Sequence, residues 1–587
     1  MNSSSNMHAS PRTHSHRTIA TIIAAALIGL ITWVFSGAYA WRGYPADHAH
    51  GTAIAVVLGL AAQVTLAAVA TMSIRSLPSG RVVLPLAVAA WTIARLTTSS
   101  LFPLISDEAY HWLWAGHLDL GYYDHPGMVA WLARLFAPWH GEAAALVRLS
   151  SVLLGTGMVW LVHRLARSTT RDHNVADRAA LLFMLVPLFA GGSMILFPSM
   201  SVYFFWWLTI LLAWRAMRGD RLRDWALMGL AWGASTNANF TTFMLPAWVG
   251  AFLLLSRRDR RFILRPGPYV ALLAGAVGFL PTLIWNATHD WDTLAFNFVR
   301  RHTEAQLQIE NVGLYVGGLL LMLSPVLGAA MLAAGARQAV RAWREQDRGR
   351  LFLACMGWGP VLAFLGFSLT QEVNAHYAGP GFVPLLILFC DSSRRAPHAR
   401  PRPPTIGTRG AHACTAIMFA VVLAPALIPA DTAYAWMRRI APQQADRAAK
   451  RTAEVYGWSA IGAFLDGRGE RFGVGTPQVL LAPSYAQASM LMHYARGVDL
   501  AYNLGEGRSP FGQQFRHWGP LSTLRAGCEA LIVYAGWHDH DADLAEWRRH
   551  FDHVEAVSTD IAGADARLKY FTIYRGVGYR GTLRNAK

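Results

Sequence analysis

The chain has 587 residues, of which 53% are hydrophobic and 15% are charged, and it contains 23 tryptophans. A composition this apolar excludes a chain built only of water-soluble domains and indicates an integral membrane protein. The formal net charge of +17 does not indicate nucleic-acid binding, because the arginines lie in short clusters between long apolar runs, where they act as topology signals.

Apolar runs close to the length of a membrane-spanning helix recur from the N-terminal region to about residue 430. They lie at 18–36, 51–72, 82–103, 145–165, 179–197, 201–217, 224–238, 242–256, 268–286, 312–334, 351–369, 377–391 and 412–430. The length criterion therefore predicts about thirteen membrane spans. The runs near 224–256 are short, and they fit either two broken helices or one kinked pair.

The arginines predict the orientation, because Lys and Arg are enriched in cytoplasmic loops. They fall on alternate loops, as Arg12 and Arg17, Arg75 and Arg81, Arg164 and Arg167, Arg215 and Arg218, 257–261, 337–344 and 394–409. We therefore expect a multi-pass protein of the cytoplasmic (inner) membrane with a cytoplasmic N-terminus. Loop 104–144, loop 287–311, link 370–376 and everything after 431 are predicted to be extracytoplasmic.

The first apolar run also has an alternative interpretation. Residues 38–40 read Ala-Tyr-Ala, which resembles a signal-peptidase site. The run before them is longer than the core of an ordinary signal peptide, so we expect an uncleaved membrane anchor.

Two acidic clusters lie in the first extracytoplasmic loop. Residues 107–112 read Asp-Glu-Ala-Tyr-His-Trp, and residues 121–126 read Gly-Tyr-Tyr-Asp-His-Pro. Carboxylates at a membrane exit can act as a general base towards an acceptor hydroxyl or amine, or hold a divalent cation against a phosphate. The alternative is that Asp107 only caps the next helix and Glu108 only favours its positive end. The loop histidines, His111, His117, His125 and His140, match no standard zinc spacing.

A basic cluster lies in the 287–311 loop. Arg300, Arg301 and His302 could bind a donor phosphate by charge-assisted hydrogen bonds. Binding to lipid headgroups is an equally good interpretation of basic residues at the membrane surface.

The composition changes after residue 430. Segments 479–481, 531–534 and 570–574 have the β-branched and aromatic residues typical of strands, between helix-like stretches. We therefore predict a soluble extracytoplasmic α/β domain at 431–587, after an N-terminal tail with two extra spans at 1–81 and a membrane domain at 82–430. The four cysteines, at 355, 390, 414 and 528, predict no internal disulfide or zinc set.

Five segments carry a resemblance to a known family. They are Ser-Asp-Glu-Ala-Tyr-His-Trp-Leu-Trp at 106–114, Leu-Gly-Tyr-Tyr-Asp-His-Pro at 120–126, Leu-Ile-Trp-Asn at 283–286 followed by His289 and Trp291, Glu-Val-Asn-Ala-His-Tyr at 372–377 and, more weakly, 482–494. These segments resemble the protein-mannosyltransferase-like family, the GT-C glycosyltransferases (glycosyltransferase family 39-like) that include the aminoarabinose transferases acting on lipid A. The resemblance covers most of the chain after residue 82.

The resemblance implies a polytopic α-helical membrane protein with a GT-C-like fold and a small C-terminal α/β extracytoplasmic domain. It implies an enzyme, a hexosyl- or pentosyltransferase that takes a sugar from a polyprenyl-phosphate donor and passes it, with inversion, to a lipid, glycan or protein acceptor at the outer face. Asp107 would be the catalytic base or would orient the acceptor, and Glu108 would support it. The resemblance also implies donor-phosphate or substrate binding by Tyr110, Tyr123, Asp124, His125, Glu372, Asn374 and His376. Arg300, Arg301 and His302 join this set because of their charge. No cofactor is certain; a divalent cation stays open, with Asp107 as its ligand if one binds.

Two positions depart from the family pattern. Ser199 stands where many relatives carry an aspartate, and Asn239 stands where relatives carry a lysine. Neither residue supplies the missing charge, so an inactive paralogue that binds a sugar lipid is a second hypothesis. A transporter is a third, with the break at 233–239 as its best feature, but no internal repeat accompanies it. Aromatic residues of the tail could stack on sugars or simply pack in the domain core; they are Tyr485, Tyr494, Tyr502 and Trp518.

Overall fold

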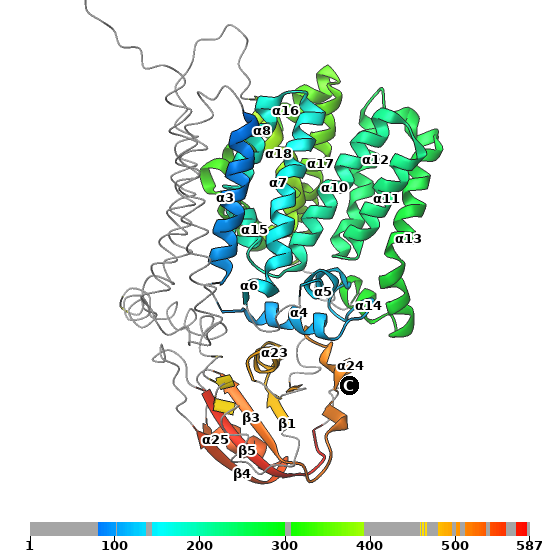
Figure 1. The fold of residues 1–587 in the computed structure, drawn as a ribbon. Helices are drawn as coiled ribbons and strands as arrows, with labels where there is room; N and C mark the ends of the chain where they lie inside the picture. The colour runs from blue at the N-terminus through cyan, green and yellow to red at the C-terminus, as the bar shows by residue number, and fades with distance from the viewer. Residues whose placement is uncertain are drawn as a thin grey trace, which may run out of the picture.

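The structure is a computed structural model. It describes residues 80–100, 103–136, 144–299, 307–392, 439, 458, 461–462, 464–465, 479–495, 501–504, 511–519, 521–535, 540–558 and 571–583. Helices built from residues up to 392 form a bundle, and residues 479–583 form a small α/β domain at one end of it (Figure 1). The predicted spans at 18–36, 51–72 and 412–430 lie outside the described residues.

The bundle and the loop elements beside it are helical throughout. The elements are α3 (Gly80–Ser100), α4 (Ser106–Gly116), α5 (Met128–Arg134), α6 (Ala144–Val147), α7 (Leu149–Thr170), α8 (His173–Phe183), α9 (Pro187–Gly192), α10 (Pro198–Gly219), α11 (Leu222–Thr236), η2 (Phe240–Met244), α12 (Leu245–Leu255), η3 (Arg260–Leu264), α13 (Pro266–Thr288), α14 (Asp292–Phe298), α15 (Ile309–Leu323), α16 (Pro325–Glu345), α17 (Arg348–Phe367), η5 (Ala375–Ala378) and α18 (Gly379–Ser392). Proline begins four of the described helices, α9, α10, α13 and α16, because its fixed φ suits the first turn, where its missing N–H is not needed.

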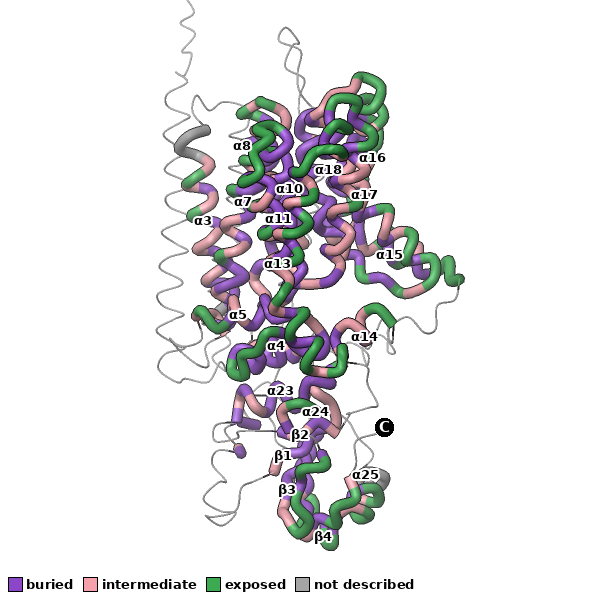
Figure 2. Tube along the Cα trace, turned by 90° about the vertical axis from the view of Figure 1, so that its right-hand side faces the viewer, coloured by how far each residue is buried: buried purple, intermediate pink, exposed green. Residues whose placement is uncertain are grey.

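The surface of the bundle is apolar where the sequence predicts lipid. Large aliphatic side chains are exposed along α13 and α15, including Leu273 at 69% and Leu314 at 65%. Helix α15 projects from the side of the bundle with much of its length exposed (Figure 2). An exposed apolar surface of this kind would be unfavourable in water and is typical of lipid contact.

The predicted number of spans is only partly tested. Among the described residues, four helices are long and apolar enough to cross a membrane, α7, α10, α13 and α17, and a fifth follows if α15 and α16 form one bent span. The run predicted as a span at 312–334 is divided between α15 and α16, which meet at an angle of 105°. Ser324 has a φ of 71°, and Pro325 starts the second helix, so the backbone turns sharply there.

Two other apolar runs are also divided. The run predicted at 179–197 is split into α8 and α9 before Pro187, whose ring cannot continue the preceding helix. The short runs at 224–256 form two helical segments, α11 and η2–α12, with a break between Thr236 and Phe240.

Helices α11 and α13 pack with their backbones in close contact. A Cβ added to Gly233 would lie 2.6 Å from the Cα of Gly278. Beside this contact, Asn237 donates from Nδ2 to the Gly278 carbonyl at 2.5 Å and accepts from the Thr282 hydroxyl at 2.7 Å. The polar segment at 233–239, which suggested a transporter-like break, therefore forms hydrogen bonds that join α11 to α13.

The C-terminal domain contains a mixed sheet. Its elements are β1 (Val479–Ala482), α23 (Tyr485–Tyr494), β2 (Ala501–Asn503), α24 (Phe515–Trp518), η6 (Leu521–Thr523), β3 (Ala530–Ala535), α25 (His540–Trp547), β4 (Phe551–Ser558) and β5 (Phe571–Tyr579). The strand order is β2-β1-β3-β5-β4, with β1 parallel to β2 and β3, and with β5 antiparallel to β3 and β4. The three strands predicted from the sequence are confirmed as β1, β3 and β5.

Helix α4 forms a layer between the bundle and the sheet. It runs across the ends of the bundle helices, and α23 lies against it on the other side (Figure 1). One hydrophobic cluster includes Tyr110 and Leu113 of α4, Leu491 of α23 and Ile573 of β5. The first loop and the C-terminal domain therefore share a core, which fixes the loop against the sheet.

Candidate active site

The first turn of α4 sends its two acidic side chains in different directions. Glu108 Oε2 accepts a hydrogen bond from the backbone N–H of Ile105 at 3.1 Å. Glu108 therefore pairs with a backbone N–H at the start of the helix that has no partner within the helix. Asp107 instead accepts a hydrogen bond from the Tyr485 hydroxyl in the C-terminal domain, at 3.2 Å on Oδ1. The alternative that Asp107 only caps the helix therefore does not account for its hydrogen bond with Tyr485.

Glu108 is fully buried in a polar network. Arg148 Nε donates to Oε1 at 2.7 Å and Nη2 donates to Oε2 at 2.5 Å. The backbone N–H of Leu196 donates to Oε1 at 2.9 Å. Arg148 also donates to the carbonyls of Ser99 and Pro103. The Glu108 carboxylate therefore joins α4 to the segments of Arg148 and Leu196, and its support of Asp107 in catalysis stays a prediction.

Asp107 is half-buried, and its environment changes its acidity. Removal from water raises the pKa of the carboxyl group, and the nearby charge of Glu108 raises it further, while the hydrogen bond from Tyr485 acts in the opposite direction. A carboxylate whose pKa is raised is a better proton acceptor, so this residue is suited to general-base chemistry.

Asp124 lies in the second acidic cluster, on a tight turn. The turn is closed by a bridge between Gly121 and Pro126 and by a 3.1 Å hydrogen bond from Tyr122 N to His125 O. Asp124 is only 4% exposed. Its Oδ2 accepts from the Tyr110 hydroxyl at 2.5 Å, which links this turn to α4.

The C-terminal domain also contacts this turn. The Gly512 N–H donates to Asp124 Oδ1 at 3.1 Å, and the Tyr123 N–H donates to Gln514 Oε1 at 2.8 Å. From the other side, Thr293 donates to the Tyr122 carbonyl at 2.9 Å. The turn is thus held between α14 and the C-terminal domain.

Two imidazoles lie beside the acidic clusters. The rings of His111 and His125 have centroids 6.3 Å apart. Burial and, to a smaller extent, the neighbouring His125 lower the pKa of His111 to about 3. His111 is therefore neutral at physiological pH. Among the residues that the structure describes, no group of three or more His, Cys, Asp or Glu side chains could hold a metal ion.

The other predicted substrate-binding residues lie between α17 and α18 or are outside the described residues. Glu372 and Asn374 are exposed, and the His376 carbonyl accepts from the Tyr203 hydroxyl of α10 at 2.6 Å. The His376 carbonyl therefore contacts α10, while η5 as a whole packs on α15, α17 and α18. Arg300, Arg301 and His302 lie outside the described residues.

The two departures from the family pattern have ordinary local settings. Ser199 lies in the first turn of α10. Asn239 is the N-cap residue of η2, where its Oδ1 accepts the Thr241 N–H at 2.9 Å.

The tail aromatics contact the first loop or neighbouring residues. Tyr494 accepts the Leu104 N–H at 3.2 Å. Trp518 stacks on His117 with ring centroids 4.8 Å apart. Tyr485 reaches Asp107, as described above, while Tyr502 lies beside Thr523.

Three residues of this site were not predicted from the sequence. Gly512 contributes only a backbone N–H, and Gln514 belongs to a loop with no distinguishing pattern, so neither carries a signal. Arg148 does carry one. It stands at the outer end of a predicted span, where the distribution of arginines predicts few positive charges, and a buried acidic partner explains its presence.

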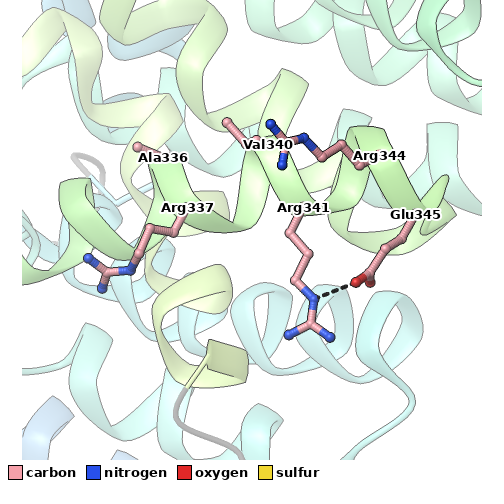
Figure 3. A pocket seen from close by; sticks show the side chains of 6 residues that line it. All are labelled: Ala336, Arg337, Val340, Arg341, Arg344 and Glu345. Carbon is pink, nitrogen blue, oxygen red and sulfur yellow. Dashed lines mark hydrogen bonds and ion pairs between the residues drawn. The ribbon is translucent and has the colours of Figure 1, made fainter.

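A separate cavity lies far from these residues. It has a volume of about 570 Å³ and is lined by one face of α16, with Arg337, Arg341 and Arg344 around it (Figure 3). This end of α16 lies at the end of the bundle opposite to the C-terminal domain (Figure 1). The cavity is therefore not part of the candidate site.

Comparisons with known proteins agree with the resemblance. Residues 124–285 match the family model described as dolichyl-phosphate-mannose-protein mannosyltransferase. An undecaprenyl phosphate-alpha-4-amino-4-deoxy-L-arabinose arabinosyl transferase of Pseudomonas aeruginosa is 28% identical over 288 residues, 47% of this chain and 51% of the relative. The lipid A galacturonosyltransferase RgtD of Rhizobium johnstonii is 27% identical over 282 residues, 46% of this chain and 56% of the relative. The chain thus spans about half the length of the curated relatives it matches.

Solved structures share the fold over a longer part of the chain. The crystal structure of ArnT from Cupriavidus metallidurans in the apo state has a TM-score of 0.55 and 15% identity, covering 85% of this chain and 98% of that chain. The same protein bound to undecaprenyl phosphate has a TM-score of 0.54 and 15% identity, covering 87% of this chain and 100% of that chain. The predicted resemblance is therefore confirmed: residues 124–285 are similar to the dolichyl-phosphate-mannose-protein mannosyltransferase family, and the chain shares the membrane fold of ArnT.

Proposed function

We propose that this protein is a glycosyltransferase that moves a sugar from a polyprenyl-phosphate donor to a lipid or glycan acceptor at the outer face of the cytoplasmic membrane. The observation that carries the proposal is Asp107, a half-buried carboxylate with a raised pKa at the end of a bundle with the ArnT fold. The names of two relatives refer to an undecaprenyl-phosphate-linked sugar and to lipid A, which favours this donor class and a lipid acceptor.

The proposed reaction is an inverting displacement. An acceptor hydroxyl or amine attacks the anomeric carbon from the face opposite the phosphate, and the bond between that carbon and the phosphate oxygen breaks. The electron pair leaves with polyprenyl phosphate, and the Asp107 carboxylate takes the acceptor proton. Asp124 and His125 would lie near the donor phosphate, with Tyr110 fixing Asp124 through its 2.5 Å hydrogen bond.

The orientation is part of the same proposal. Arginines of α16 lie at the end of the bundle away from α4 and the C-terminal domain (Figure 1). Because positive residues are enriched on the cytoplasmic side, the acidic loop would face outward, where a lipid or glycan of the cell envelope is accessible.

Asp107→Asn tests the role of the base. The full-length protein in lipid vesicles would receive a panel of polyprenyl-phosphate sugars with pentosyl or hexosyl groups, and release of polyprenyl phosphate would be measured. Asparagine can still accept from Tyr485 but cannot take a proton, so we expect release to fall about a hundredfold or more. A general base is active only when it is deprotonated, so wild-type release should be full at neutral pH and should fall as the pH is lowered. Because the pKa of Asp107 is raised, this fall should begin at a higher pH than the ordinary pKa of aspartate would give.

The matched control is Asp290→Asn. Asp290 is an exposed residue between α13 and α14 with a φ of 51°, a conformation that asparagine also adopts. This variant should retain wild-type release. Equal release by Asp107→Asn and the wild type would remove Asp107 from the chemistry. Saturable donor binding without release by the wild type would instead support the inactive sugar-lipid-binding protein.

A further inference from the structure

Both acidic clusters of the first loop are held by the same part of the C-terminal domain. Asp107 accepts from the Tyr485 hydroxyl at 3.2 Å, and Asp124 accepts from the Gly512 N–H at 3.1 Å. Tyr485 begins α23, and Gly512 precedes α24, so two segments of the soluble domain reach into one loop of the membrane domain.

Tyr485 and Gly512 also contact each other closely. A Cβ added to Gly512 would lie 2.1 Å from Cγ of Tyr485, so only glycine allows the backbone to lie against this ring. Gly512 has a φ of +76°, in the left-handed region that side chains other than glycine rarely adopt. Both the close approach and the backbone conformation therefore require glycine here.

Tyr485 also contacts Tyr110, the tyrosine whose hydroxyl donates to Asp124. The rings of Tyr485 and Tyr110 have centroids 5.0 Å apart. Tyr110 in turn stacks on Phe515, with centroids 5.9 Å apart and ring planes 7° apart. The Tyr485 ring thus contacts both groups that bind the Asp124 carboxylate, the Tyr110 hydroxyl and the Gly512 amide.

We propose that Tyr485 is a positioning residue for Asp107 and that, with Gly512, it sets the orientation of the Asp107 and Asp124 carboxylates relative to each other. This inference rests on the proposed glycosyltransferase function. It assigns the C-terminal domain a part in assembling the active site, beyond any contact with the acceptor. A displacement of about 1 Å of a reacting group is enough to slow an enzyme greatly, so a hydroxyl that fixes the base has a measurable effect.

Tyr485→Phe separates positioning from packing, because it keeps the ring and removes only the hydroxyl. In vesicles with a donor that the wild type uses, we expect kcat to fall about tenfold while the KM for the donor changes by less than about twofold. Thermal unfolding should stay close to the wild type. A purely structural tyrosine would instead leave kcat per folded molecule unchanged.

Gly512→Ala disturbs the same contact from the opposite side. The added methyl group would displace Tyr485, so kcat should fall at least as far as in Tyr485→Phe. The control is Gly527→Ala. Gly527 has a φ of +84° with no atom within 4 Å of an added Cβ, so this variant has the backbone strain without the displaced ring. It should retain the wild-type kcat.

A second readout does not depend on turnover. A water-soluble carbodiimide with an amine nucleophile modifies accessible carboxyl groups, and mass spectrometry would give the rate at Asp107 relative to exposed Asp290. We expect this relative rate to rise several-fold in Tyr485→Phe and in Gly512→Ala, and to stay unchanged in Gly527→Ala. An unchanged rate and an unchanged kcat in Tyr485→Phe would overturn the inference while leaving the glycosyltransferase proposal intact. A wild-type protein that releases no polyprenyl phosphate would refute that proposal, and the labelling rates would still decide whether Tyr485 positions Asp107.

Discussion

Asp107 and Glu108 are adjacent in the sequence but have different surroundings. Successive residues of a helix point about 100° apart, so one carboxylate faces the C-terminal domain and the other faces the bundle. The side chain of Glu108 is 0% exposed and pairs with Arg148, of which 4% is exposed. This pair would be expensive to break, because either charge left alone would be buried without compensation.

Arg148→Gln tests this argument. The substitution leaves the buried Glu108 carboxylate without its cation, and we expect a loss of about 3–5 kcal/mol in the free energy of unfolding. Unfolding of the purified protein by titration with a denaturing detergent would measure it. Arg575→Gln is the control, because Arg575 pairs with the partly exposed Glu529 and Glu555, and its loss should change stability by about 1 kcal/mol or less. Similar losses in both variants would contradict a buried pair at Glu108.

The sequence predicts the acidic residues of the site but not what holds them. Asp107 and Asp124 stand out because they lie in a loop between apolar runs and match a family pattern. Tyr485 lies 378 positions from Asp107 in the chain, and no local pattern predicts that pairing. Gly512 contributes a backbone N–H, which every residue except proline has. The supporting contacts depend on how the C-terminal domain docks, which is a property of tertiary packing.

The positions of the bundle helices follow from local sequence, but their breaks and bends do not follow from length. Apolar length predicts the bundle helices well, because in lipid the backbone must satisfy its own hydrogen bonds. The bend at Ser324 and the break before Pro187 do not follow from apolar length alone, although a proline stands at each of them. In the described part of the tail, β1, β3 and β5 were predicted, whereas β2 has three residues and β4 carries charged residues, so neither has a strand pattern.

Gly233→Ala tests the close contact of α11 and α13. The added Cβ would meet the backbone of α13, 2.6 Å from the Cα of Gly278 and 2.7 Å from the carbonyl oxygen of Gly275, so the helices must separate. We expect a loss of about 1–3 kcal/mol in the free energy of unfolding.

The matched control is Gly317→Ala in α15, where an added Cβ has no atom within 4 Å. Alanine is the better helix former, so this variant should be about 0.5–1 kcal/mol more stable than the wild type. The two substitutions are chemically identical, and the sign of the effect should differ. Stabilisation by Gly233→Ala would mean that α11 and α13 are not in backbone contact in the protein.

At the scale of the whole molecule, the fold class follows from composition and apolar periodicity, while the number of spans does not. Among the described residues, helices of spanning length are fewer than the apolar runs, and three predicted runs lie outside the described part. The distribution of arginines gives a more direct test, because it predicts which end of the bundle faces the cytoplasm. The C-terminal domain and the basic end of α16 lie at opposite ends of the bundle (Figure 1). A reagent that cannot cross the membrane should therefore reach only one of them from outside the cell.

Single cysteines at the two ends measure this orientation. Ala526 lies in an exposed turn of the C-terminal domain, and Arg344 is exposed on α16. In a variant whose four native cysteines are replaced, Ala526→Cys should react in intact spheroplasts with a maleimide that cannot cross the membrane, and Arg344→Cys should react only after lysis. The reverse pattern would place Asp107 on the cytoplasmic side, where neither the proposed acceptor nor the proposed direction of transfer could hold. Because the bundle fold alone is compatible with either orientation, this labelling decides which compartment supplies the acceptor.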